Sequence, residues 1–142
     1  LNDSLVGETT SNPFTDILTE DKKIFVKADF AADNYRDRVD ARYRGLSAIH
    51  WNSYQKSFRV NFPPEHLFNG MESLNLVIPY DRDYYAELLN MYRAKKLGLH
   101  SPDMDFARLF LNGQDMGVYL VFENWSLSWL KKQGFLFFLP CL

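Results

Sequence analysis

Residues 106–123 read FARLFLNGQDMGVYLVFE, and this stretch decides the fold class. Two apolar runs flank Asn112 and Gly113, and Asn-Gly between apolar strands is the strongest short-range signal for a β-hairpin. The second run carries apolar side chains at both odd and even positions between Met116 and Phe122. A strand that is apolar on both faces is typical of the middle of a sheet. We therefore predict a hairpin whose second strand is covered on both sides.

Further strand patterns precede this hairpin. Over residues 23–30 and 35–44, apolar and polar side chains alternate with the period of two that is typical of half-buried strands. A third strand is expected over residues 55–62, where a Pro-Pro pair ends it, and a short fourth strand over residues 74–79. The sequence thus predicts several antiparallel strands before the hairpin.

Residues 81–97 change period and predict one long helix. Apolar side chains recur there at three-to-four spacing, and Gly98 suits the left-handed position at a helix end. Asp81 or Asp83 is expected to cap the start, and the helix would be about 25 Å long. A shorter helix is expected over residues 125–132. The predicted fold class is therefore α+β, a mainly antiparallel sheet with one long helix on a face.

Composition limits the possible functions. The chain has 142 residues, of which 46% are hydrophobic, enough for one compact domain. The net charge of -2 gives no electrostatic argument for a nucleic-acid partner. No apolar run approaches the roughly 20 residues of a membrane span. The only cysteine, Cys141, cannot form a disulfide within the chain, and the three histidines are too far apart for metal-ligand spacing.

The chain divides into three parts by composition. Residues 2–12 are polar, and residues 1–20 are expected to be a flexible lead-in. Residues 21–134 carry the strand and helix patterns of the folded region. Residues 135–142 form a Phe-rich apolar tail, which we expect to be either a truncated element whose packing partner lies beyond residue 142 or a sequence artefact.

Lys56 is the most informative charged residue. It has the same parity as Phe58 and Val60 in the third predicted strand, so it projects from the apolar face. An ammonium group in that position is costly unless it reaches water or an anion. Two interpretations remain open, a lysine that extends to solvent at the strand end and a lysine aimed at phosphate oxygens in a cleft. Glu87 on the predicted helix is the candidate carboxylate partner.

Residues 44–48, Arg-Gly-Leu-Ser-Ala, follow the second strand. A flexible loop of this kind can place backbone N–H groups near phosphate, although an ordinary turn has the same composition. With Arg44 at its start, this loop is the second candidate for an anion site.

Several segments carry a family resemblance as a series. They are residues 41–45 followed by Trp51, residues 55–60, residues 68–71 with 74–76, and the Asn-Gly hairpin that leads through Gly-Val-Tyr-Leu to Glu123. In this order and spacing they resemble the CotH family of spore-coat protein kinases. The resemblance covers roughly residues 25–130.

The resemblance implies an atypical protein-kinase fold that uses ATP with Mg²⁺ to phosphorylate Ser or Thr, often on secreted or spore-coat proteins. It implies that Lys56 contacts the ATP phosphates, that Glu87 orients this lysine, and that Glu123 ends the strand entering the hinge between lobes. Arg44 joins them as a candidate cofactor-binding residue. By resemblance alone, the protein is expected to be exported, in the cell envelope or in the spore coat.

The region after Glu123 contains no Asp, Glu or His. The catalytic and metal-binding aspartates of the family lie downstream, so we assign no catalytic or metal-binding residue to this chain. The resemblance thus implies the ATP-binding N-terminal part of a kinase, inactive without its C-terminal lobe. Two rival hypotheses are a non-catalytic scaffold that keeps the shape of the N-terminal lobe, and an α+β module that binds a ligand through surface aromatics.

Overall fold

The computed structural model describes residues 23–46, 50 and 54–135. These residues form a six-stranded antiparallel sheet with the strand order β1-β2-β3-β4-β6-β5, together with three helical segments. The predicted lead-in and nearly all of the predicted apolar tail lie outside the described residues. The elements are β1 (Val26–Ala32), β2 (Tyr35–Tyr43), β3 (Phe58–Asn61), β4 (Ser73–Val77), the 3-10 helix η3 (Pro79–Arg82), α2 (Ala86–Lys96), β5 (Met104–Leu111), β6 (Gln114–Glu123) and α3 (Leu127–Lys132).

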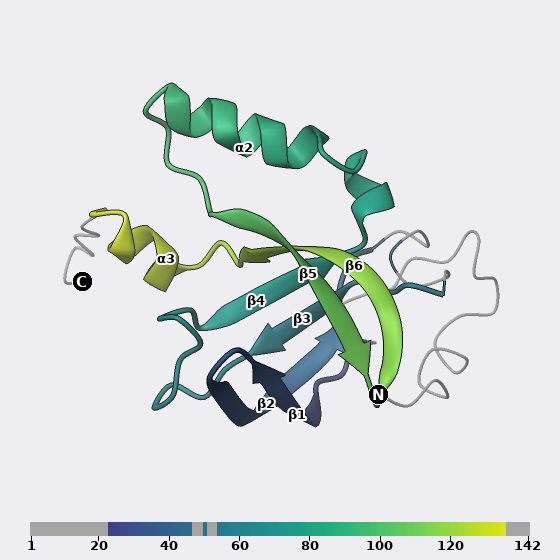
Figure 1. Ribbon diagram of the computed structural model, residues 1–142. Coiled ribbons are helices and arrows are strands. Elements are labelled where there is room, and N and C mark those ends of the chain that lie inside the picture. Colours follow the sequence, from purple (N-terminus) through teal and green to yellow (C-terminus); the bar gives the residue numbers. More distant parts are fainter. Residues whose placement is uncertain (1–22, 47–49, 51–53, 136–142) are drawn as a thin grey trace.

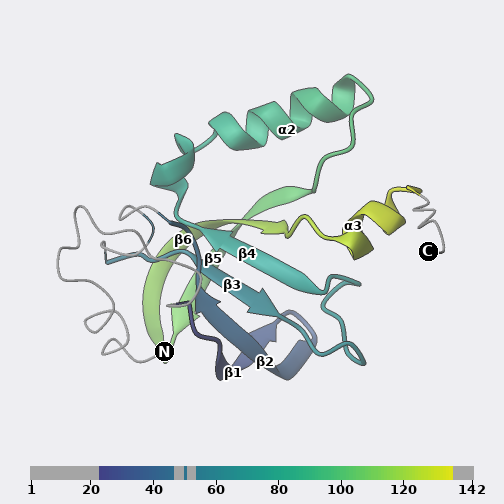
Figure 2. The same ribbon diagram turned by 180° about the vertical axis from the view of Figure 1, so that it is seen from behind.

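The hairpin predicted from residues 106–123 is confirmed as β5 and β6. Asn112 and Gly113 form its turn with φ angles of 51° and 79°, and the primed hairpin turns require such positive values. β6 lies between β4 and β5, as its apolar character on both faces predicts. Both strands curve strongly, so that the sheet becomes a half-barrel (Figures 1 and 2).

Apolar side chains cover both faces of the sheet. On one face, residues from β2, β3, β4 and β6 form the larger cluster, in which Tyr119 is fully buried. On the other face, Val77, Leu120 and Phe122 form a smaller cluster with Met104 and Phe106 packed against it. Neighbouring positions of β6 therefore belong to different clusters, because successive side chains of a strand point to opposite faces.

The predicted long helix over residues 81–97 is not confirmed. The segment instead contains η3 and then α2, which has 11 residues. Asp83 and Tyr84 lie between them with φ angles of 45° and 56°, in the left-handed region that a right-handed helix cannot contain. Figure 1 shows α2 beyond β5 and β6, and none of its residues is buried. The predicted packing of a long helix on a sheet face is thus not confirmed either.

Of the signals predicted at the two ends of the helix, only the one at the C-terminal end is confirmed. Neither predicted aspartate caps it, because its N-cap position is Tyr85 and no side-chain hydrogen bond is made there. Asp81 lies in η3, and Asp83 is the residue that ends η3. Gly98 does have the predicted left-handed conformation, with φ of 75°.

The third strand is shorter than predicted, because residues 55–57 do not pair with β4. The backbone of Ser57 instead bonds to two residues of the preceding loop. Its N–H donates to the carbonyl of His50 at 2.7 Å, and its carbonyl accepts from the Arg44 N–H at 2.9 Å. Lys56 therefore precedes β3 and lies in a connecting segment. No helix within the described residues has the length and apolar character needed to cross a membrane.

Candidate functional site

A row of side chains crosses one face of the sheet at the level where β2 ends. The strand register aligns Arg42 of β2 with Arg59 of β3, Arg59 with Asn75 of β4, and Asn75 with Phe122 of β6. Antiparallel register partners project from the same face. The topology therefore gathers polar residues from separate parts of the chain beside the smaller apolar cluster.

Asn75 connects this row by hydrogen bonds. Its Oδ1 accepts from Arg44 Nε at 2.9 Å and from Arg59 Nε at 3.1 Å. Its Nδ2 donates to Asn124 Oδ1 at 3.3 Å, and that oxygen also accepts from Arg59 Nη2 at 2.9 Å. Asn75 is fully buried, so these bonds supply the partners that a buried amide requires. Two guanidinium groups are thereby held side by side.

A pocket of about 380 Å³ opens over these residues. We name it the basic pocket, and none of its described lining residues is a carboxylate. Two acids contact Arg82 of this lining, Asp81 at 3.0 Å and Glu87 at 3.9 Å. A concave surface with this excess of cations attracts anions. The lining residues are Lys23, Arg42, Arg44, Gly45, Leu46, His50, Arg59 and Arg82.

The surroundings of Arg44 show how crowded the positive charge is. The pKa of Arg44 is lowered to about 10, first by burial and then by the nearby Arg59 and Arg82, whereas Asp81 and Glu87 oppose the shift. Arg44 still carries its charge at neutral pH, because a pKa of about 10 lies well above 7. Its guanidinium also lies over the Phe122 ring, 5.5 Å from the centroid.

His50 fixes one wall of the basic pocket. Its Nδ1 lies 3.2 Å from Ser57 Oγ, and its Nε2 lies 3.4 Å from Asp81 Oδ1. The Ser57 hydroxyl also accepts from the Ile78 N–H at 3.2 Å. The ring packs directly on Gly45, where a Cβ would lie 2.1 Å from its Cγ and Cδ2. His50 thus ties the loop after β2 both to the segment before β3 and to η3.

This environment predicts a stability loss in mild acid. Burial lowers the pKa of His50 below its ordinary value of 6.5, Asp81 opposes the shift, and Arg44, Arg82 and Lys23 add to it. The unfolded chain therefore binds this proton more tightly than the folded protein does. The free energy of unfolding should fall as the pH drops below about 6.5 and should level off below the folded pKa.

Urea denaturation from about pH 7.5 to about pH 5 measures this dependence. The variant His50→Gln keeps polar atoms at the same position and cannot titrate, so it should lose that part of the slope. Equal slopes in both proteins would contradict the assignment to His50.

Among the predicted site residues, Arg44 lies at the basic pocket and Glu87 contacts one of its lining residues. Glu87 lies in the first turn of α2 and reaches the pocket edge through Arg82. Its charge opposes the lowering of the Arg44 pKa. Within the predicted phosphate-binding loop of residues 44–48, residues 47 and 48 lie outside the described residues.

Glu123 lies at the end of β6 and forms an ion pair with Lys132 of α3, with 2.6 Å between Oε1 and Nζ. Its neighbour Asn124 belongs to the network around Asn75. Glu123 is thus one residue from the polar row, although it does not line the basic pocket.

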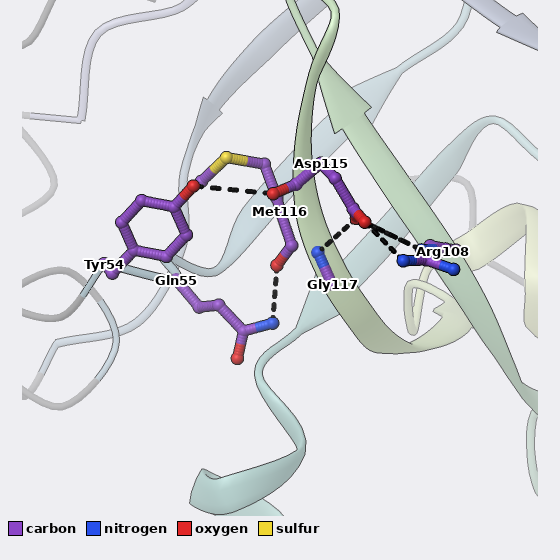
Figure 3. A network of polar contacts seen from close by, with 6 residues as sticks. All are labelled: Tyr54, Gln55, Arg108, Asp115, Met116 and Gly117. Carbon is purple, nitrogen blue, oxygen red and sulfur yellow. Dashed lines mark hydrogen bonds and ion pairs between the residues drawn. The ribbon is translucent and has the colours of Figure 1, made fainter.

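Lys56 lies in the short segment before β3, which is attached to the β5–β6 hairpin (Figure 3). Gln55 Nε2 donates to the carbonyls of Met116 and Val118 at 2.6 and 3.3 Å. Tyr54 contributes a longer hydroxyl bond to the carbonyl of Asp115. Because Ser57 is bonded on the other side, the backbone of Lys56 is held from both directions. Its side chain is half-buried and is not among those that line the basic pocket.

The hairpin is itself stiffened where this segment attaches. Asp115 forms an ion pair with Arg108 across the strands and accepts from the Gly117 N–H at 2.9 Å (Figure 3). The pKa of the Asp115 carboxyl is held below its usual value, first by the hydrogen bond from Arg108 and then by that from Gly117. The strand register shifts at this level, between Leu109 and Phe110.

No sequence pattern predicted that Asn75, Arg59, Arg82 and His50 belong to one site. One signal was present for Asn75, a polar residue between Leu74 and Leu76 in an otherwise apolar strand. Within the described part of the chain, no group of three His, Cys, Asp or Glu side chains is placed to hold a metal ion.

Comparison with known proteins identified a matching family and a curated relative. The family model described as "CotH kinase protein" matches residues 41–137. The inner spore coat protein H of Bacillus subtilis (strain 168) is 29% identical over 96 residues, which is 67% of this chain and 26% of that protein. The chain thus spans about a quarter of the curated relative it matches.

Proposed function

The chain belongs to the CotH kinase protein family, and on this premise we propose that it is the ATP-binding N-terminal part of a protein Ser/Thr kinase. Its partner within the whole enzyme is a C-terminal lobe that carries the catalytic and metal-binding aspartates. The protein substrate belongs to the spore coat or to another exported structure, in keeping with the name of the Bacillus relative.

The observation that carries this proposal is the basic pocket. Arg44 and Arg59 are fixed side by side on Asn75. Guanidinium groups match the oxygens of phosphate in charge and geometry. Phosphoryl transfer depends on positioning and on neutralising the phosphate charge, so an array of fixed cations is what an ATP-binding lobe must supply. The volume of about 380 Å³ is within the usual range for small-molecule sites.

The order of the elements gives further support. Protein kinases hold ATP with strands, a strand lysine and a glutamate on the helix that follows. Here β2, β3 and β4 are followed by α2 with Glu87 in its first turn, and the hairpin then ends at Glu123. We propose that Glu87 sets the position of the pocket cations through Arg82, and that Glu123 begins the connection to the C-terminal lobe.

Lys56 keeps its proposed role as a second phosphate contact. Its backbone is fixed by the flanking hydrogen bonds of Gln55 and Ser57, and the long side chain supplies reach. When bound, Mg²⁺ would balance the remaining phosphate charge. Among the described residues, no group of three His, Cys, Asp or Glu side chains is placed to hold it, so its ligands would come from the C-terminal lobe.

Removing one pocket guanidinium tests the proposal. The 142-residue chain should bind ATP with Mg²⁺ in isothermal titration calorimetry, and Arg44→Ala should weaken binding about tenfold or more, because a buried charge contact to phosphate is lost. The matched control is Arg38→Ala, an exposed arginine of β2 outside the basic pocket. This control should bind like the parent.

Several outcomes separate the rival functions. No binding by the parent chain would favour the non-catalytic scaffold, and equal loss in both arginine variants would point to unspecific charge attraction. A ligand-binding module that uses surface aromatics would be insensitive to Arg44→Ala. If Lys56→Ala leaves the affinity unchanged while Arg44→Ala lowers it, ATP binding at the basic pocket is supported and the proposed phosphate contact of Lys56 is refuted.

A further inference from the structure

We propose that residues 136–139 of this chain, Leu-Phe-Phe-Leu, dock in an apolar groove between α2 and the start of β5. We name it the α2 groove. Among its described lining residues only Lys95 is charged, and that ammonium forms an ion pair with Asp103. The other lining residues are Leu88, Leu89, Met91, Tyr92, Pro102 and Met104. The inference is independent of ATP binding.

The α2 groove leaves apolar surface open to water. Its volume is about 470 Å³. Leu89 and Tyr92 on its helical wall are 49% and 59% exposed, and no residue of α2 is buried. A helix of 11 residues is marginal in water by itself and takes most of its stability from apolar packing. Within the described residues, α2 therefore lacks the cover that such a helix needs.

Contacts between α2 and β5 give the groove a defined direction. At one end, the Tyr85 ring lies 5.6 Å from the Phe106 ring. At the other end, Lys95 pairs with Asp103. The helix and the strand thus run in opposite directions along the two sides of the groove, from the Lys95 end to the Tyr85 end.

The chain leaves α3 beside the Lys95 end of this groove. Gly134 follows α3 with a φ angle of 85°, a left-handed conformation that redirects the backbone after a helix. Gln133 Oε1 lies 3.1 Å from His100 Nδ1, and the Phe135 ring centroid is 4.9 Å from that of His100. His100 precedes the lining residue Pro102 by two positions. Figures 1 and 2 both show α3 on the side where α2 connects to β5.

The segment that starts there has the length and the chemistry to fill the groove. Four extended residues span about 13 Å, whereas the helical wall from Leu88 to Tyr92 rises about 6 Å along its axis. Transfer of large apolar side chains from water to an apolar surface is favourable. The proposal gives the apolar tail a packing partner within the chain, in place of the expected partner beyond residue 142. It would also steady α2, whose Glu87 contacts Arg82 of the basic pocket.

Cross-linking to the only cysteine, Cys141, tests the docking in the 142-residue protein. The variant Leu89→Cys places a thiol on the wall toward the Tyr85 end, where a docked segment would bring Cys141. The matched control is Leu99→Cys, an exposed leucine next to His100 that does not line the groove. With oxidised glutathione, the disulfide within one chain should form about tenfold faster in Leu89→Cys than in Leu99→Cys, because docking raises the effective concentration of one thiol at the other.

A second change shows that the apolar side chains cause this preference. Phe137→Asp and Phe138→Asp together keep the length of the tether but add two charges that resist transfer to an apolar surface. In the Leu89→Cys background they should lower the rate to that of Leu99→Cys. Peptide mass spectrometry and non-reducing electrophoresis identify each disulfide.

The remaining outcomes overturn the proposal. A tail that does not dock would reach Leu99→Cys at least as fast as Leu89→Cys, since residue 99 lies nearer to the point where the tail starts. A rate that ignores the two aspartates, or no disulfide in either variant, would also refute docking. Disulfides between two molecules would assign the α2 groove to a second copy of the chain. ATP binding plays no part in these readouts, so failure of the proposed function would leave this inference intact.

Discussion

Replacing Gly45 with alanine is expected to lower the free energy of unfolding by about 3 kcal/mol, the sum of a backbone cost and a steric cost. Gly45 has a φ angle of 100°, which residues other than glycine rarely adopt. The added Cβ would also lie 2.1 Å from two ring atoms of His50. That ring cannot move aside freely, because its nitrogens contact Ser57 and Asp81. Urea denaturation measures the loss.

Gly113→Ala is the matched control for this prediction. Gly113 also has a positive φ, 79°, and a Cβ added there would meet no atom within 4 Å. The Gly113→Ala variant should therefore lose only the backbone contribution to the free energy of unfolding, about 1 kcal/mol. If both variants lose the same free energy of unfolding, the contact between Gly45 and His50 contributes nothing to stability. The wall of the basic pocket would then be less rigid than the structure indicates.

Leu120→Ala is expected to cost about 3 kcal/mol of the free energy of unfolding, a typical loss for a buried leucine cut back to alanine. Leu120 lies in the middle of β6 with no exposed surface and packs with Val77 and Phe122. The cavity would open beneath the Phe122 ring, which in turn supports the Arg44 guanidinium. We therefore expect ATP affinity to fall together with stability in this variant.

Val118→Ala provides the comparison for Leu120. Val118 lies on the same strand two residues earlier, so its side chain points to the same face, yet it is 48% exposed. The expected loss is below about 1 kcal/mol in the same denaturation experiment. Similar losses in the two variants would show that the smaller apolar cluster is not a packed core.

The sheet could be predicted from the sequence because its signals are local. The Asn112–Gly113 turn and the apolar runs beside it specify the hairpin without reference to the rest of the chain. Period-two alternation likewise located β1 and β2 to within a few residues. The antiparallel α+β class follows from these elements together.

The helix was predicted less well, because its start is set by backbone conformation. Apolar spacing continues through Asp83 and Tyr84, while both residues adopt positive φ angles. Nothing in their side chains demands this, since such angles are uncommon outside glycine. Apolar spacing alone therefore predicted one continuous helix across a break that the tertiary structure imposes.

The candidate site was predicted only in part. The composition of its loop pointed to Arg44, whereas Arg59, Asn75 and His50 converge on Arg44 only after the strands take their order in the sheet. For Arg59 and Asn75 this convergence is non-local, because they lie 15 and 31 positions after Arg44 in the sequence. The phosphate contact of Lys56 and the hinge position of Glu123 stay predictions.

The position of β6 between β4 and β5 has a consequence for how the protein is made. During synthesis β1 to β4 emerge in order, and each can pair with the strand before it. The free edge of β4 is completed only by β6, which begins at Gln114. Until then a nascent chain presents an open strand edge of the kind that recruits other strands. Ribosome-bound chains that end before β6 should therefore depend on chaperones more than chains that include it.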